Sequence, residues 1–298
     1  MTDIFNLRQF TSSAGRLGRL PVRAPADRFP INWAHDYLVA PTPAPVYPID
    51  VTGGLTDFGM LGNDQYGDCG EAGVRHVEMT TALAAGSAVP SFTSEESIAE
   101  YLDFTGGQDT GVVLADFLLW LFNRGRIRGF APVDHNNVPQ MDALMAEFHG
   151  LYVGVSLTSD AQQLFPDGVW TTANGEAADP SMGHCIEKVF SDGATEDKWV
   201  TWARLMKSTV GWSAACVDEA WLVLTTEEQM AKFVPQLIAE IQALGGRFAV
   251  PPQPVPSISG SSFVQRVEQI AREEIADLEK IITDIKQAVG VVGGRLDS

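Results

Sequence analysis

The sequence predicts an α+β protein, with a helix-rich first half and a strand-rich second half. Between residues 69 and 148 the apolar residues recur at helical spacing, whereas after residue 150 they form short runs that are typical of buried strands. Because helices and strands are segregated along the chain and do not alternate, the pattern favours a domain with two lobes. A chain of 298 residues that is 45% hydrophobic can bury such a core and still carry an appendage.

The composition argues against several kinds of partner and compartment. With 20 basic and 38 acidic residues the formal charge is -18, so we expect neither nucleic acid nor a membrane surface as a partner. The three cysteines, Cys69, Cys185 and Cys216, are too few and odd in number for a disulfide framework, which favours a reducing compartment. No stretch approaches the roughly twenty apolar residues of a membrane span. We expect a protein that folds in the cytoplasm, and incorporation into a phage virion stays open for it.

Residues 1–50 are expected to form an extended N-terminal arm. They are rich in Pro, Arg and Ala, and the repeated X-Pro pairs disfavour packed helices. Such an arm either wraps over its own domain or a neighbour, or serves as a propeptide or docking strand. Residues 51–246 then form the folded domain.

The first half of this domain carries clear helix signals. Asp68 is placed to cap a helix that begins near Cys69, and Thr93 with Glu96 forms a capping-box pattern before a further helix. Residues 112–123 predict a strongly apolar helix. In the second half, short apolar runs predict buried strands at 151–155, 185–190, 199–202 and 220–224, and a closing helix is expected at 227–244.

A linker and a coiled coil are expected after the domain. Residues 247–261 contain a proline-rich stretch followed by serines, which is typical of a semi-rigid spacer. Residues 262–290 repeat apolar side chains at heptad spacing along two seams. Because an isolated helix of this length is marginal in water, the stripe needs a partner surface, and we expect a homo-oligomer, a trimer or higher. The alternative is a helix that docks back on the domain.

The loop before Cys69 is the most informative segment for chemistry. It reads Gly-Asn-Asp-Gln-Tyr-Gly-Asp-Cys from residue 62, so a thiol stands where a polar, glycine-rich loop becomes a helix. The backbone N–H groups and macrodipole of a helix N-terminus stabilise an anion, and we therefore expect the pKa of Cys69 to be lowered. Asn63 and Gln65 precede it and offer side-chain amides for an oxyanion hole.

A base for this thiol must come from another part of the chain. His184 is the best of the five histidines, because it follows Gly183 at the mouth of a predicted strand and is open to approach. His76 lies on the same helix as Cys69 and is poorly placed to meet its thiol. Cys69, His184 and Cys185 lack the short spacing of structural zinc sites, so we expect neither a metal nor a cofactor.

Together these motifs resemble the papain-like cysteine peptidases, above all a divergent branch found in phage and bacterial genomes. In that branch Gly-Asn-Asp-x-x-Gly-Asp-Cys is followed by a Gly-His strand and then by a Thr-Trp-Gly strand; the similar segments here are 62–69, 183–184 and 201–203. The closing stretch 212–224 also resembles the end of those domains. The resemblance covers roughly residues 15–245 and leaves the coiled coil unexplained.

The resemblance implies roles for single residues. Cys69 would be the nucleophile, His184 the general base and acid, and Asn63 or Gln65 the amide that stabilises the oxyanion. Peptidases of this type orient the histidine with the Asn of an Asn-Ser-Trp-Gly strand, but this chain has Val-Thr-Trp-Ala there. Thr201, or an acid from elsewhere, is left as the third member.

Two functions stay open at the level of sequence. In the first, the chain is a cysteine hydrolase, either a peptidase or a cell-wall amidase, that binds an extended peptide between its lobes. In the second, it is a catalytically idle structural or decoration protein of a phage particle that binds virion proteins. The retained Cys69 and His184 favour the first, and the missing Asn favours the second. Whether the site is active is left open.

Overall fold

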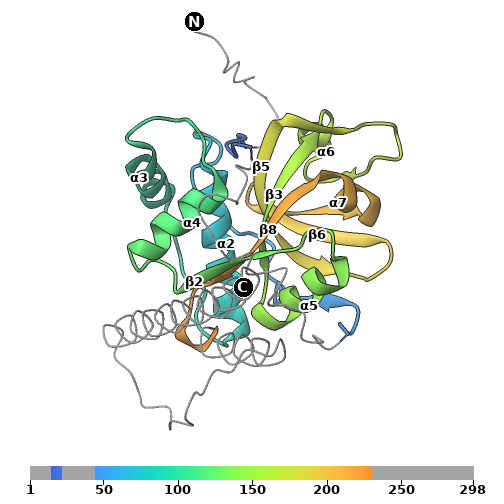
Figure 1. Cartoon of the computed structure of the whole chain (residues 1–298), viewed down its shortest axis with the longest axis horizontal. Helices are drawn as coiled ribbons and strands as arrows, with labels where there is room; N and C mark the ends of the chain where they lie inside the picture. The colour runs from blue at the N-terminus through green and yellow to red at the C-terminus, as the bar shows by residue number, and fades with distance from the viewer. Residues whose placement is uncertain (1–14, 22–43, 230–298) are drawn as a thin grey trace, which may run out of the picture. The chain divides into compact units, whose positions relative to one another are not determined.

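The computed structural model describes residues 15–21 and 44–229 (Figure 1), all within one compact unit. Most of the expected closing helix, the linker at 247–261 and the coiled coil at 262–290 lie outside the described residues. The described residues have the mixed helix and sheet architecture that the sequence predicts. Among them, no helix has the length and apolar character needed to cross a membrane.

The helices of the first half agree with the sequence signals. Helix α2 spans Cys69–Ala84, α3 spans Ser94–Thr105 and α4 spans Leu114–Asn123. The predicted capping box is confirmed at α3, where Thr93 and Glu96 each accept a hydrogen bond from the other's backbone N–H. Asp68 stands at the N-cap of α2 but makes no side-chain capping bond, because its backbone (φ -93°, ψ 22°) is not in the extended conformation that capping requires.

The strands form one eight-stranded sheet with the path order β2-β8-β3-β5-β6-β7-β4, and β1 pairs with β5. Every pair is antiparallel except that of β4 with β7. The strands predicted from the apolar runs are found in β3, β5, β6 and β8. The bounds are β1 Ile49–Asp50, β2 Gly129–Val133, β3 Leu151–Thr158, β4 Val169–Trp170, β5 Ala178–Ser191, β6 Glu196–Thr201, β7 Arg204–Thr209 and β8 Val217–Leu224.

The division into helical and strand-rich halves is less complete than predicted. Strand β2 comes from the helix-rich half and pairs with β8. Its Pro132 is tolerated because β2 is the first strand of the sheet order and has a ladder on one side only. Helices α5 (Val138–Phe148), α6 (Ala161–Leu164) and α7 (Val210–Cys216) lie among the strands in sequence.

The sheet is a central layer with helices on both faces, and β3 contributes side chains to the hydrophobic clusters on both of them. All its residues are buried. Leu151 and Val153 belong to a hydrophobic cluster with residues of α5 and α7, whereas Tyr152 belongs to a second cluster with residues of α2 and α4. Because successive side chains point to opposite faces, this strand is apolar at nearly every position.

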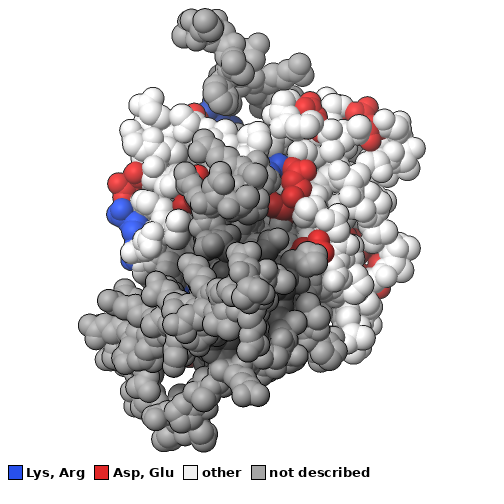
Figure 2. All heavy atoms as spheres, viewed as in Figure 1, with Lys and Arg blue, Asp and Glu red and all other residues white. Residues whose placement is uncertain are grey.

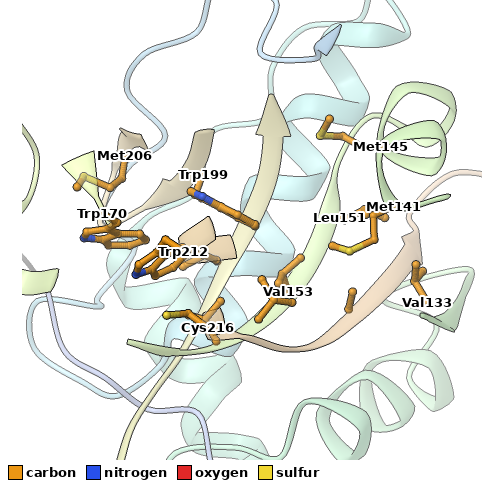
Figure 3. Close-up of a cluster of buried hydrophobic side chains, with 14 of the residues drawn as sticks. Val133, Met141, Met145, Leu151, Val153, Trp170, Trp199, Met206, Trp212 and Cys216 are labelled. Carbon is orange, nitrogen blue, oxygen red and sulfur yellow. The ribbon is translucent and has the colours of Figure 1, made fainter. Parts of the chain in front are cut away.

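Tryptophans fill the cluster on the α5 and α7 face (Figure 3). Trp170 and Trp212 stack with 4.6 Å between ring centroids, and Trp199 meets Trp212 edge-on at 5.9 Å. Large rings of this kind bury much apolar surface and prefer these geometries. On the surface seen in Figure 2, acidic side chains gather in several places and basic ones in fewer, in keeping with the acidic composition.

Candidate active site

Cys69 is the first residue of α2, and the loop before it is firmly held. The Gly67 N–H donates to Asp109 Oδ1 (2.9 Å), and the Tyr101 hydroxyl donates to the same oxygen (2.8 Å). Gly62 has a φ of +96°, and a Cβ there would lie 2.5 Å from a side-chain carbon of α3. The thiol therefore stands at a fixed point where the loop becomes a helix.

The environment of the Cys69 thiol differs from the expectation. The side chain is buried, and its pKa is raised to about 12, mainly by burial and further by the charge of Asp68. The backbone amides of Cys185 and Gly18 lie close enough to the sulfur to oppose this rise in pKa. The prediction of a lowered pKa is thus wrong for this state of the protein, because the loss of hydration outweighs the favourable helix dipole.

His184 lies in β5, and its ring is fixed by the last residue of β6 and the residue that follows it. Its Nε2 is 2.8 Å from Thr201 Oγ1, and the ring stacks on Trp202 with 4.7 Å between ring centroids. Its Nδ1 is buried and has no hydrogen-bond partner among the described residues. Burial, with a further contribution from the charge of Arg19, lowers the pKa of His184 to about 3, so the ring is neutral at pH 7.

The turn between β6 and β7 explains where Trp202 lies. Thr201 pairs with Arg204, so Trp202 and Ala203 form the connection of a tight hairpin. Their φ values are 45° and 70°, in the left-handed region that such hairpin turns require. Ala203 stands where the resembling peptidases have glycine, and its positive φ is the reason a glycine suits that position.

The backbone of β5 next to His184 passes the Cys69 sulfur, but the two side chains are not paired. Cys185, whose backbone amide acts on the sulfur, directly follows His184 in β5. The sulfur belongs to the cluster of Tyr152 and Cys185, whereas the histidine ring stacks on Trp202, which belongs to the cluster on the other face of the sheet. No hydrogen bond joins the sulfur to the imidazole, and no ion pair forms because both groups are neutral.

The two candidate oxyanion amides have different surroundings. Asn63 is 2% exposed, and its Nδ2 donates to the Tyr66 carbonyl (3.1 Å), so this amide stabilises the loop before the thiol. Gln65 is exposed. In the part of the chain that the structure describes, neither side-chain amide is bonded to Cys69.

A piece of the N-terminal arm crosses the site. We call residues 15–21 the strap; in Figure 1 it is the short dark-blue stretch between helices α2–α4 and strand β5. On the helical side, the Val112 N–H donates to the Gly18 carbonyl (2.8 Å). On the sheet side, the Arg19 N–H donates to the Gly183 carbonyl (3.2 Å). An extended chain is therefore held by backbone hydrogen bonds from both sides.

Glycines on both sides allow this close approach. A Cβ on Gly18 would lie 1.7 Å from the carbonyl oxygen of Gly67, and a Cβ on Gly183 would lie 2.3 Å from the carbonyl oxygen of Arg19. Gly67 belongs to the loop before Cys69, and Gly183 immediately precedes the candidate histidine. Consecutive strap residues thus cover the backbone beside both candidate catalytic groups.

The strap lies against its own domain, which is compatible both with a wrap over the domain and with a propeptide. Arg19 is a residue of the site that was not predicted from the sequence. The sequence did contain a signal that this segment packs closely on the domain, namely Gly15 and Gly18 within a stretch otherwise rich in Pro, Arg and Ala. Glycine is typical of positions where two backbones come into contact.

No metal site accompanies this arrangement in residues 15–21 and 44–229. In these ranges, no group of three or more His, Cys, Asp or Glu side chains is arranged to hold a metal ion. The chemistry that the site could support is that of a thiol and an imidazole.

Comparison with known proteins identifies the fold. No family model and no curated protein sequence matches the chain. Among solved structures, xylellain, a cysteine protease from Xylella fastidiosa, is 11% identical over 76% of this chain and 100% of that chain, with a TM-score of 0.53. A digestive procathepsin L 3 of Tenebrio molitor larval midgut is 10% identical over 65% of this chain and 74% of that chain, with a TM-score of 0.48. The likeness to xylellain shows a papain-like fold, as the sequence predicted.

Proposed function

We propose that this chain is a papain-like cysteine hydrolase, a peptidase or cell-wall amidase, that is held closed by its own strap. The observation that carries the proposal is the path of the strap. An extended segment lies between the start of α2, which bears Cys69, and β5, which bears His184, with hydrogen bonds to both sides. Backbone pairing with an extended chain is a common way for a protein to hold a peptide.

In the open enzyme, Cys69 is the nucleophile and His184 the general base. The ring of His184 would have to leave its stack on Trp202 and turn its unpartnered Nδ1 toward the sulfur to take the thiol proton. The thiolate would then attack the carbonyl carbon of the scissile amide. The imidazolium then gives its proton to the leaving amine, and water hydrolyses the thioester. Thr201 holds Nε2 and so orients the ring, in place of the missing Asn.

The tetrahedral oxyanion needs donors close to the nucleophile. The backbone N–H groups at the start of α2 point out of the helix end and are natural donors. Asn63 or Gln65 would add a side-chain amide, as the family resemblance implies. Asn63 would have to release its bond to the Tyr66 carbonyl to do so.

The closed state is inactive for a physical reason. With the strap in place, burial keeps Cys69 as a neutral thiol and His184 as a neutral imidazole. Withdrawal of the strap would admit water, which lowers the thiol pKa and raises the imidazole pKa toward their ordinary values. Activity should therefore depend on displacing residues 15–21.

A catalytically idle structural protein is the second candidate. It is favoured by the absence of a sulfur–imidazole hydrogen bond and by the neutral state of both groups. In this form the strap would be a permanent part of the fold. A coiled coil at 262–290 would supply the main function, as an oligomeric component of a phage particle, and light scattering of the full chain would test for the trimer or higher oligomer.

The deciding experiment uses a variant in which the strap cannot seat. Gly18→Ala is matched by Gly211→Ala, because a Cβ on Gly211 would meet nothing closer than 3.9 Å. Both full-length proteins are incubated with fluorogenic peptides and with cell-wall peptides. Hydrolysis is expected from Gly18→Ala and much less from Gly211→Ala.

Two cysteine variants assign this hydrolysis to the site. Cys69→Ala in the Gly18→Ala background should abolish it, whereas Cys216→Ala should preserve it because Cys216 lies in the core on the α5 and α7 face. A folded Gly18→Ala protein that exposes Cys69 to alkylation and still cleaves none of these substrates would favour the idle structural protein.

A further inference from the structure

The side chain of Arg19 fills a buried acidic pocket. It is 2% exposed, and its Nη1 donates to Glu219 Oε1 (3.1 Å). Its Nη2 donates to Asp218 Oδ2 and lies 3.4 Å from Ser156 Oγ. The guanidinium is thus recognised by two carboxylates of β8 and a hydroxyl of β3.

The pocket is held in shape by bonds that do not involve Arg19. The Ser156 hydroxyl donates to Asp218 Oδ2 (2.7 Å), and the Trp221 Nε1–H donates to Glu219 Oε2 (2.8 Å). Gly154 leaves room for the arginine stem, because a Cβ there would lie 2.8 Å from the Arg19 Cδ. A site whose polar groups are positioned in advance binds with less loss of entropy.

The present occupant leaves one donor unused. The Nε of Arg19 is buried and has no hydrogen-bond partner among the described residues. An unpaired buried donor costs free energy, so it makes the closed state less stable than the other bonds of Arg19 alone would suggest.

We propose that Asp218, Glu219 and Ser156 form a guanidinium subsite of the strap site, by which we mean the residues that contact the strap, and that the strap site takes extended peptides in which a glycine is followed by an arginine. The glycine is required because a Cβ at the Gly18 position would lie 1.7 Å from the Gly67 carbonyl oxygen. Lysine is a poor substitute because a single ammonium does not match the planar fork that bridges two carboxylates. The inference rests on the proposed function, in which the strap site binds peptides.

Binding is tested with a peptide that copies the strap. The probe is the acetylated and amidated peptide Gly-Arg-Leu-Gly-Arg-Leu-Pro, offered to the full-length protein carrying Gly18→Ala and Cys69→Ala. Citrulline, a neutral isostere, in place of the second arginine should weaken the dissociation constant on the order of 100-fold, because buried charge-assisted hydrogen bonds are lost.

The same peptide contains its own control. Its first arginine corresponds to Arg16, which is 31% exposed in an ion pair with Asp109. Citrulline there should change the dissociation constant by no more than about 3-fold. Alanine in place of the second glycine should abolish binding. Equal affinity for the parent peptide and the peptide with citrulline at the second arginine would overturn the inference.

A second measurement does not require the strap to leave. Arg19→Ala in the full chain empties the pocket, and millimolar ethylguanidinium should then raise the melting temperature, whereas ethylammonium should not. The control is Arg16→Ala, which removes the exposed ion pair with Asp109. Its melting temperature should change by the same amount with ethylguanidinium and with ethylammonium. An Arg19→Ala protein that also responds equally to both ions would count against the subsite.

These outcomes separate the subsite from the hydrolase. Arginine-dependent binding without hydrolysis of any peptide by the Gly18→Ala protein would leave the subsite in place and remove the hydrolase. Hydrolysis with no preference for arginine would leave the hydrolase and remove the subsite.

Discussion

Gly18→Ala should expose Cys69. A methyl group on Gly18 would lie 1.7 Å from the carbonyl oxygen of Gly67 and 2.3 Å from its carbonyl carbon, and both atoms belong to backbone. The loop that carries Gly67 is tied to Asp109 and is not free to yield. We therefore expect the strap to leave its place, and water to reach the thiol.

The size of the effect follows from the bonds that the strap loses. Arg19 makes charge-assisted hydrogen bonds to Asp218 and Glu219, and such bonds contribute about 1.5–3 kcal/mol each. The Asp218 side chain is 32% exposed, so the lower end of the range applies, or about 3 kcal/mol in total. Since about 1.4 kcal/mol is a factor of ten, the open fraction should rise about 100-fold.

Alkylation by iodoacetamide, read by peptide mass spectrometry, measures that fraction. A buried thiol reacts only from open molecules, so the labelling rate of Cys69 should increase by about the same factor. Once hydrated near His184, the thiol should also label well below about pH 8. Gly211→Ala should label like the wild-type protein, and Cys216 provides an internal reference. An unchanged Cys69 rate in a folded Gly18→Ala protein would refute the reasoning.

Further predictions concern stability. Ala203→Gly should raise the free energy of unfolding by about 1 kcal/mol, because Ala203 has a φ of 70°. Urea unfolding measures this as a higher midpoint, and an equal or lower midpoint would contradict the strain. Burial lowers the pKa of His184 to about 3 and that of His76 to about 4 in the folded protein, whereas both have a pKa near 6.5 in the unfolded chain. Below about pH 6.5 the unfolded chain therefore binds more protons than the folded protein. The contribution of both histidines to stability should then fall from about pH 6.5 toward pH 4, and replacing His76 with Gln should reduce this dependence. Burial raises the pKa of Asp68 from 3.8 to about 8. The stability of the folded protein that depends on protonated Asp68 is therefore lost as the pH rises from 3.8 to about 8. Asp68→Asn should gain stability over the wild type between pH 4 and 8, by at most about 1.4 kcal/mol per pH unit; a constant difference would disprove this.

Local signals in the sequence were sufficient for much of the fold. The capping box at Thr93 and Glu96, the helix start at Cys69 and the apolar run of β3 depend on neighbouring residues, and the structure has all of them. The strand β2 was missed because its pairing with β8 joins segments far apart in the chain. Such pairing leaves little trace in a short window of sequence.

Motif and spacing are local properties of the sequence, and they were enough to place Cys69 at a helix start and His184 in a strand. His184 lies in the middle of β5 and not at the strand mouth that was predicted, because β5 begins at Ala178. The chemical state of both groups depends on their surroundings in the folded protein. A thiol at a helix N-terminus is acidic when water surrounds it, but here burial in the folded protein raises its pKa instead. The acidic pocket for Arg19 is likewise a tertiary property, since its carboxylates on β8 and its hydroxyl on β3 meet the arm only after folding.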